Sequence, residues 1–244
     1  HMTALSLWRQ KRLAISYISW FNLSTRSGVI QMSRTQGARN AHFAERRTAL
    51  IVKARDRLSL QTGDSPSFRE LALSCGVSVT TLRHYFGSRE ELIKAVFEQA
   101  LEAGQRHLDR ARAPESAVQQ VSLEDSLRAF LSRVVVGWTQ GFVSDLHRIG
   151  LAEGLRNART ALDYLNDVLE PTLQALEARL EGHAARGEIV DCQPRHAALM
   201  LLSPLLLALL HQRDLGGTRC RPLAIPALID EHVKVFVRAY RPAG

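Results

Sequence analysis

Closely spaced helix-start and helix-stop residues in the first half of the chain place the tightest limits on its fold. Two Ser-x-x-Glu segments have the spacing of a capping box, in which a hydroxyl and a carboxylate each accept a backbone N–H at a helix N-terminus. A further serine can cap a segment between two glycines that stop helices. The residues concerned are Ser67 with Glu70, Gly76, Ser78, Gly87, and Ser88 with Glu91. The pattern predicts short helices over 68–75 and 79–86, followed directly by a longer one.

Helical periodicity continues on both sides of this region. Leu50, Ala54 and Leu58 recur every four residues, which is typical of the buried stripe of an amphipathic helix. Alternating β-branched residues, the mark of strands, are hard to find. We therefore predict an all-α fold. The remaining helices are expected over 46–63, 88–104, 123–138, 141–155, 160–186 with a kink at Pro171, 194–213 and 227–240.

Charge divides the chain unevenly. The formal net charge is +8, and residues 1–45 carry six Lys or Arg against one acidic residue, which indicates an anionic partner at this end. His1 and Met2 resemble a cloning remnant. Residues 3–33 can be read as an appended amphipathic helix, or as upstream sequence if translation starts at Met32. A signal peptide is a weaker reading, because serines interrupt the apolar part. We treat 1–45 as an N-terminal extension, or basic arm.

Cysteine usage and hydropathy bear on the compartment. Cys75, Cys192 and Cys220 lie far apart and form no CxxC pair, which favours a reducing cytoplasm. The apolar run 201–210 is short of the roughly 20 residues that span a bilayer, and it contains Pro204. We expect it to be a buried helix and expect no membrane partner.

The two short helices have the arrangement of a helix-turn-helix (HTH) motif, which binds DNA. Such a motif lays one helix across the DNA backbone and inserts the second into the major groove. In the second helix only Leu82 and Phe86 have core spacing, so its polar residues face outwards. Threonine offers a hydroxyl to phosphate and a methyl to thymine, arginine can pair with guanine, and helix N-termini bind phosphate. Each residue taken singly is more often a solvated surface group. The predicted DNA-binding residues are Ser67, Ser78, Val79, Thr80, Thr81, Arg83, His84, Tyr85 and Arg89.

The segment SFRELALSCGVSVTTLRHYFGSREELIKAVF, residues 67–97, resembles the DNA-binding domain of the TetR family of bacterial transcriptional regulators. The family pattern reads approximately T-V-x-x-I-A-x-x-A-G-V-S-x-G-T-L-Y-x-Y-F-x-S-K-E-E-L. Two positions depart from it on the reading face: Thr80 replaces the common Gly, and Arg83 replaces the first Tyr, which typically touches phosphate in the family. Arg83 therefore contacts either phosphate or a base. Cys75 occupies the position of the small residue before the glycine in the family pattern, and we expect it to be buried like an alanine there.

The resemblance implies three parts: the extension over 1–45, a three-helix DNA-binding domain over 46–104, and a helical effector-binding and dimerisation domain over 105–244. It further implies a cytoplasmic homodimer that pairs through 194–213 and 227–240 and a repressor released from a palindromic operator by a small molecule. The wholly apolar 197–210 segment fits such an interface, although burial within one chain is the alternative.

Effector residues are harder to choose from sequence. Some residues in the second half combine apolar bulk with polar atoms, as small-molecule sites do, and favour an apolar or aromatic effector. Each is more often plain core. The candidate ligand-binding residues are Trp138, Phe142, His147, Tyr164 and Met200.

Other classes of function find less support. The sequence has no nucleophile elbow, HExxH, P-loop or dinucleotide fingerprint, so we expect no enzyme, catalytic residues or cofactor. No histidines have metal-ligand spacing, although His183, His196 and His211 could converge in three dimensions. The remaining alternative is a helical interaction or membrane-surface protein anchored through residues 5–23.

Overall fold

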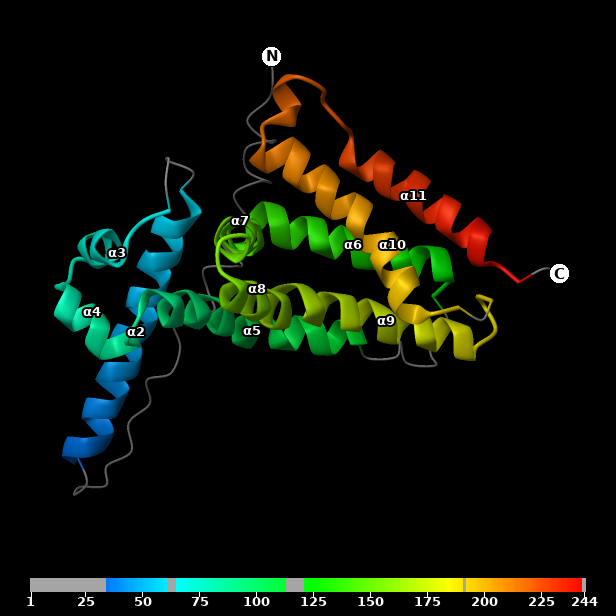
Figure 1. Cartoon of the computed structure of the whole chain (residues 1–244). Helices are drawn as coiled ribbons and strands as arrows, with labels where there is room; N and C mark the ends of the chain where they lie inside the picture. Colours follow the sequence, from blue (N-terminus) through cyan, green and yellow to red (C-terminus); the bar gives the residue numbers. More distant parts are fainter. Residues whose placement is uncertain (1–33, 61–64, 113–120, 191, 243–244) are drawn as a thin grey trace, which may run out of the picture. The chain divides into compact units, whose positions relative to one another are not determined.

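The structure is a computed structural model that describes residues 34–60, 65–112, 121–190 and 192–242. Every regular element in these ranges is helical, which confirms the all-α prediction. The helices, labelled in Figure 1, are α2 (Arg34–Ser59), α3 (Phe68–Cys75), α4 (Val79–Phe86), α5 (Arg89–Arg112), α6 (Leu123–Gln140), α7 (Val143–Gly154), α8 (Ala158–Tyr164), α9 (Glu170–Ala185), α10 (Pro194–Leu209) and α11 (Ile225–Tyr240). Two π-helical turns, η1 (Leu165–Leu169) and η2 (Leu210–Asp214), and a 3-10 turn, η3 (Gly217–Arg219), complete the set.

Residues 44–244 form one compact unit, which contains all the candidate site residues. Residues 3–33, including the proposed anchor over 5–23 and the start at Met32, lie outside the described residues.

Two helices are longer than predicted. α2 begins at Arg34 rather than residue 46 and ends at Ser59, so the described part of the expected basic arm is helical. The segment has no proline, and one internal glycine, Gly37, weakens a helix without ending it. For the same reason α5 continues past Gly104 to Arg112. The expected domain boundaries at 45/46 and 104/105 both fall inside helices.

The first hydrophobic cluster contains residues of α2, α3, α4 and α5, together with residues of α7 and α8. Its centre is formed by side chains that are almost wholly buried, among them Leu71, Leu82 and Phe97. Leu146, Ile149 and Tyr164 from α7 and α8 belong to the same cluster. The two short helices are thus held on a base that includes residues far away in sequence.

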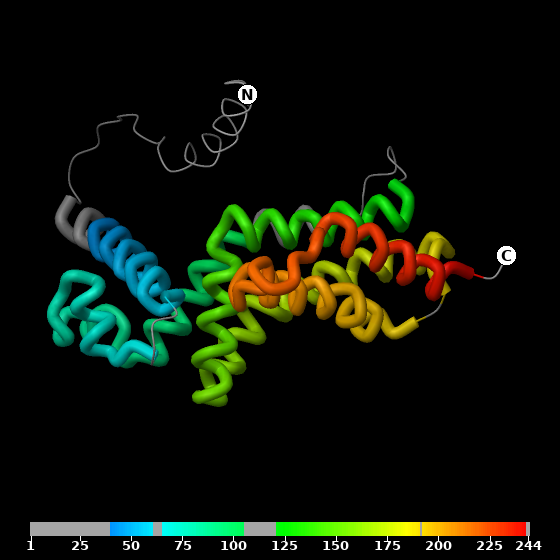
Figure 2. Tube along the Cα trace, turned by 90° about the horizontal axis from the view of Figure 1, so that it is seen from above, coloured from blue at the N-terminus to red at the C-terminus, as the bar shows by residue number. Residues whose placement is uncertain are grey.

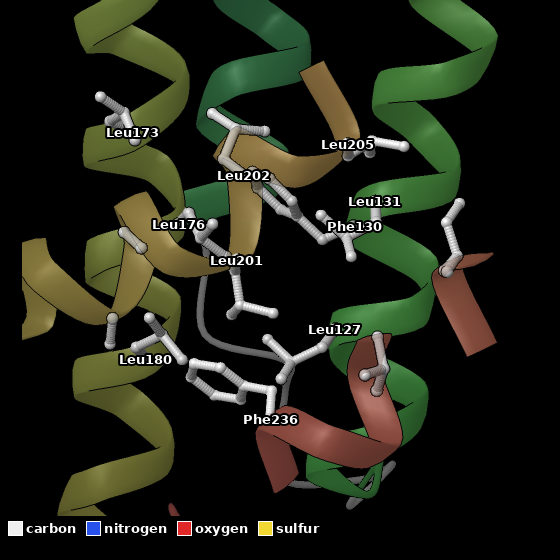
Figure 3. Packing of buried hydrophobic residues seen from close by; sticks show 14 of the residues in the cluster. Leu127, Phe130, Leu131, Leu173, Leu176, Leu180, Leu201, Leu202, Leu205 and Phe236 are labelled. Carbon is white, nitrogen blue, oxygen red and sulfur yellow. The ribbon is translucent and has the colours of Figure 1, made fainter. Parts of the chain in front are cut away.

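The second hydrophobic cluster lies among α6, α9, α10 and α11. Figure 3 shows leucines of three helices meeting there, with Phe236 of α11 closing one end. α11 contacts both α6 and α10, and the tube view shows these helices side by side (Figure 2). This cluster is the core of the C-terminal half.

Pro171 restarts a helix, as its position predicted. The proline has no N–H, and its ring would meet the carbonyl four residues earlier. The chain accommodates it with the wide turn η1 between α8 and α9, so that Pro171 lies in the first turn of α9.

The apolar helix near the C-terminus spans almost the predicted range 194–213 and extends beyond the apolar run 201–210 at both ends. α10 and η2 together span Pro194–Asp214, 21 residues with a mean hydropathy of 1.3, and are long and apolar enough to cross a membrane by length and composition alone. The core helices of globular proteins can be equally long and apolar, and Ala197, Leu201 and Leu205 of this helix are buried in the second cluster. Within the described residues it is the only helix of this kind.

Candidate nucleic-acid interface

The predicted capping box fixes the start of α3. Ser67 Oγ accepts the Glu70 backbone N–H at 3.3 Å, and the Glu70 carboxylate accepts the Ser67 N–H at 2.7 Å. The Ser67 backbone N–H, followed by the Ser67 hydroxyl, interacts with the carboxylate and holds the pKa of Glu70 below its usual range. Gly76 ends the helix with φ 71°, a left-handed conformation that favours glycine. α3 therefore begins and ends where local side-chain chemistry predicted.

α4 is anchored by two side chains and capped by one. Leu82 and Phe86 are buried as predicted. Ser78 Oγ accepts the Thr81 N–H at 3.0 Å and lies 2.9 Å from the Thr81 hydroxyl. Gly87, with φ 76°, stops the helix. This short helix is held firmly by its neighbours although its own length would not keep it folded.

The outward face of α4 carries Thr80, Arg83 and His84, all exposed. Two other predicted DNA contacts, Val79 and Tyr85, are half-buried and packed against the first cluster, so each presents only part of its side chain outwards. The reason is geometric, because Val79 opens the helix on the side of α3. A groove of about 300 Å³ beside it is lined by residues that include Arg69 and Leu73 of α3.

Cations of α2 brace the two short helices. Lys53 Nζ donates to the Cys75 carbonyl at 3.2 Å and so satisfies an acceptor at the end of α3. The Arg47 guanidinium lies 5.2 Å from the centre of the Phe86 ring. Cys75 is buried, and burial raises the pKa of its thiol, which donates to the Leu50 carbonyl at 3.6 Å. A buried thiol of this kind has a structural role.

Arg89 does not lie on the outward face of α4 with the other predicted contacts. Its guanidinium is engaged by the carboxylate of Glu153 on α7 and by Ser65 and the Pro66 carbonyl. The Arg89 guanidinium is therefore occupied by partners within the protein. A sequence pattern places a cation at this position but does not reveal a partner 64 residues away.

Three of the five candidate ligand residues come together between the two clusters. The Trp138 and His147 rings stack with centroids 4.6 Å apart, and His147 Nδ1 shares a 2.7 Å hydrogen bond with the Tyr164 hydroxyl. Trp138 Nε1 donates to Asp214 at the end of η2. Phe142 is half-buried nearby in the first cluster, under the Arg55 guanidinium.

Met200 does not join this aromatic group. Its side chain is 57% exposed on α10, where the Tyr240 hydroxyl contacts its sulfur at 3.4 Å. The prediction that it lines the same site as Trp138 is therefore wrong. A helix that is apolar on every side gives no periodicity from which to tell its buried face from its exposed one.

Burial sets the protonation of the aromatic group. Desolvation lowers the pKa of His147 to about 4 and raises the pKa of Tyr164 to about 12. Both groups are thus neutral near pH 7, which suits an apolar site.

Acid should weaken the fold through His147. Because its pKa is about 4 in the folded protein and about 6.5 when unfolded, the unfolded chain binds the extra proton over that interval. The free energy of unfolding should fall by up to about 1.4 kcal/mol per pH unit from pH 6.5 down to about 4. Urea titrations of the wild type and His147→Gln across this range test the prediction. The variant should lose that slope, and equal slopes would contradict it.

A buried polar group that the sequence did not point to lies between α6 and α9. Ser126 Oγ is 2.9 Å from His183 Nε2 and 2.6 Å from Arg179 Nη1, and His183 Nδ1 is 2.7 Å from the Glu188 carboxylate. Ser126 is completely buried, so its hydroxyl meets no substrate in this conformation. The sequence signal that could have indicated this buried group is the spacing of Arg179 and His183, which are four residues apart and so share one helix face.

The three histidines that could have converged do not form a metal site. His183 is bonded within this polar group, whereas His196 and His211 are exposed. Among the described residues, no group of three or more histidine, cysteine or acidic side chains could hold a metal ion.

Comparison with known proteins gives the family. The profile described as "Bacterial regulatory proteins, tetR family" matches residues 54–96, and that of "AefR-like transcriptional repressor, C-terminal domain" matches 125–242. The HTH-type transcriptional regulator UidR of Escherichia coli is 29% identical over 143 residues, 59% of this chain and 68% of UidR. The chain belongs to the TetR family of bacterial transcriptional regulators.

Solved structures share the fold. A TetR-family regulator from Mesorhizobium loti has a TM-score of 0.64 and 18% identity, covering 82% of this chain and 98% of its own. FadR from Bacillus subtilis, solved in complex with stearoyl-CoA, has a TM-score of 0.58 and 15% identity, covering 78% and 97%. As a member of the TetR family, the protein is a DNA-binding transcriptional regulator, and the membrane-surface alternative is not favoured.

Proposed function

We propose that the protein is a homodimeric repressor, without enzymatic activity, that acts on DNA in the cytoplasm and leaves its operator when a small apolar or aromatic effector binds. The observation that carries the DNA part is the outward face of α4. Thr80, Arg83 and His84 are exposed on a helix whose other side is pinned by Leu82 and Phe86. Such a helix can enter a major groove and keep its orientation there.

Further groups are suited to backbone phosphate. The capped N-termini of α3 and α4, at Ser67 and Ser78, present backbone N–H groups of the kind that bind anions. Thr81 and Tyr85, half-buried beside them, add hydroxyls at the edge of the same face. We propose that these groups set the register on DNA while Arg83 and Thr80 read bases.

Selection from random-sequence DNA with the full chain tests this proposal. It should enrich a palindrome, and footprinting should show two protected half-sites about one helical turn apart. Binding should weaken as salt rises, since phosphate contacts release counterions. If no sequence is enriched even at low salt, the proposal fails.

Arg83→Ala should remove base discrimination. If the guanidinium pairs bidentately with a guanine, the substitution costs about 1 to 3 kcal/mol and relaxes specificity at one base position. Anisotropy titrations on the selected operator and its single-base variants measure this. Arg221→Ala, which removes an exposed arginine in the loop before α11, is the control and should bind like the wild type. Equal loss on every sequence would place Arg83 on phosphate.

The dimer proposal rests on exposed apolar side chains of α10 and α11. Met200, Leu207 and Val235, which we call the apolar stripe, are 57%, 67% and 63% exposed. Met200 and Leu207 are seven residues apart and so lie on one side of α10. Apolar side chains grouped on two neighbouring helices mark an association surface. We propose that 194–213 and 227–240 of two copies cover each other there.

The effector proposal rests on the aromatic group of Trp138, His147 and Tyr164, with Phe142 beside it. These side chains offer flat apolar surfaces and neutral polar atoms between the DNA-binding helices and the second cluster. The structural neighbour FadR was solved in complex with stearoyl-CoA, and we take this as support for a ligand with an apolar part. A thermal-shift screen of fatty acyl and aromatic compounds, followed by operator release, tests it. Stabilisation without release would contradict the repressor mechanism.

We also propose that the chain is divided functionally into the extension over 1–45, the DNA-binding part over 46–104 and the regulatory part over 105–244. Since α5 runs across the second boundary, the two larger parts share one helix.

A further inference from the structure

Arg89 lies at the first residue of α5 and joins three segments of the chain. Its Nη1 and Nη2 donate to the two Glu153 carboxylate oxygens at 2.9 and 2.8 Å, and its Nε donates to the Pro66 carbonyl at 2.9 Å. Ser65 Oγ contacts both Arg89 and Glu153. We call Arg89, Glu153, Ser65 and Pro66 the Arg89 clamp.

The two charges occupy helix ends that oppose them. Arg89 stands at the N-terminus of α5, which favours negative charge, and Glu153 stands in the last turn of α7, which favours positive charge. Neither residue helps its own helix. Their mutual contact explains both positions, and a bidentate arginine–carboxylate pair is the geometry that fixes orientation best.

The clamp is shielded from solvent, whereas a neighbouring ion pair is not. The Arg89 and Glu153 side chains are 23% and 7% exposed. Burial alone would raise the pKa of Glu153, but hydrogen bonds from Arg89 and Ser65 and the Arg89 charge hold it below its usual range. Glu91 and Arg159 also join α5 to α8, but their side chains are 41% and 62% exposed, and such pairs contribute little.

The clamp touches both ends of the helix-turn-helix. Pro66 immediately precedes Ser67, the cap of α3, and Arg89 follows α4 after Gly87 and Ser88 alone. On the other side, α7 is packed tightly on α8, since a Cβ at Gly154 would lie 3.1 Å from the Ala161 Cα. Ser65 and Pro66 before α3, and the start of α5, are thereby tied to the closely packed pair of α7 and α8.

We propose that Arg89 is a positioning residue that holds the helix-turn-helix on α7 through Glu153, and that operator affinity depends on this clamp although it touches no DNA. This inference rests on the proposed operator binding. In a dimer the two recognition helices must meet successive major grooves about 34 to 36 Å apart. A clamped helix-turn-helix keeps that separation, whereas a loose one must be ordered on DNA at a cost in affinity.

Glu153→Gln is the decisive substitution, because it leaves every predicted DNA-facing side chain unchanged. With the selected operator, its Kd should rise about tenfold relative to the wild type, as should that of Arg89→Ala. The slope of binding against salt should be unchanged in both variants. Penalties for operators with one or two base pairs inserted between half-sites should shrink. Glu91→Gln, at the exposed pair, should bind like the wild type.

Two results would overturn the proposal. If Glu153→Gln binds like the wild type while Arg89→Ala lowers the salt slope by about one, Arg89 is a phosphate contact. If both variants bind like the wild type, the clamp has no part in DNA binding. If Glu153→Gln fails to fold, Ser65→Ala replaces it, because this substitution removes one clamp contact and leaves no buried charge without a partner. Ser65→Ala must then weaken operator binding and keep the slope of binding against salt. Failure of the wild type to select any operator contradicts the proposed function instead.

Discussion

Leu207→Asp should leave the protein monomeric and weaken operator binding by about 100-fold or more, since two linked half-site contacts bind far more tightly than one. Leu207 is 67% exposed in the apolar stripe of α10, so the substitution barely affects folding of a single chain. In a dimer it would bury a carboxylate against apolar side chains, which is costly without a partner charge. Light scattering coupled to size exclusion and anisotropy titrations measure the two effects.

Leu155→Asp is the matched control. Leu155 is 88% exposed at the end of α7, away from α10 and α11 in sequence and outside both hydrophobic clusters. The same change of leucine to aspartate there should leave a dimer with normal operator affinity. A dimeric Leu207→Asp would move the association surface elsewhere, and a monomeric Leu155→Asp would place it at the α7–α8 corner.

Local chemistry explains why the DNA-binding elements were predictable. A capping box needs only residues three apart, and a glycine stop needs only its own φ, so Ser67, Gly76 and Ser78 determine where α3 and α4 begin and end, although packing on the rest of the chain keeps them folded. The exposure of Arg83 followed from the spacing of Leu82 and Phe86. The boundaries of these helices and the face that α4 exposes could therefore be predicted from short-range spacing.

Long-range contacts explain what was not predictable. Arg89 and Glu153 are paired only because α5 and α7 pack together, and no spacing in the sequence connects them. Met200 and Leu201 are adjacent in an apolar helix, yet one is exposed and the other is buried. Which side of α10 is covered depends on α6, α9 and α11, so hydrophobicity alone could not assign Met200 to the stripe rather than the effector group.

Gly150→Ala should reduce the free energy of unfolding by about 3 kcal/mol, at the upper end of what overpacking a core usually costs. A Cβ at Gly150 would lie 2.1 Å from Cδ2 of the Tyr164 ring. The ring is buried, its hydroxyl is bonded to His147, and its centre lies 6.0 Å from that of Phe97. It therefore has no room to retreat, and α7 must separate from α8.

Gly104→Ala is the control for Gly150→Ala, because it measures the effect of replacing a helical glycine where no clash occurs. Gly104 lies within α5, and an added Cβ meets nothing within 4 Å. Alanine there should stabilise the protein by about 0.5 to 1 kcal/mol, because it restricts the unfolded chain and favours helix. Urea unfolding measures the free energy of unfolding of these two variants, of Tyr164→Ala, and of Gly150→Ala combined with Tyr164→Ala. The double variant should lose less free energy of unfolding than the sum of the losses of Gly150→Ala and Tyr164→Ala, because removing the ring removes the clash. Strict additivity would mean that Gly150 is not required for the close approach of Tyr164, and that α7 and α8 are kept together by other contacts.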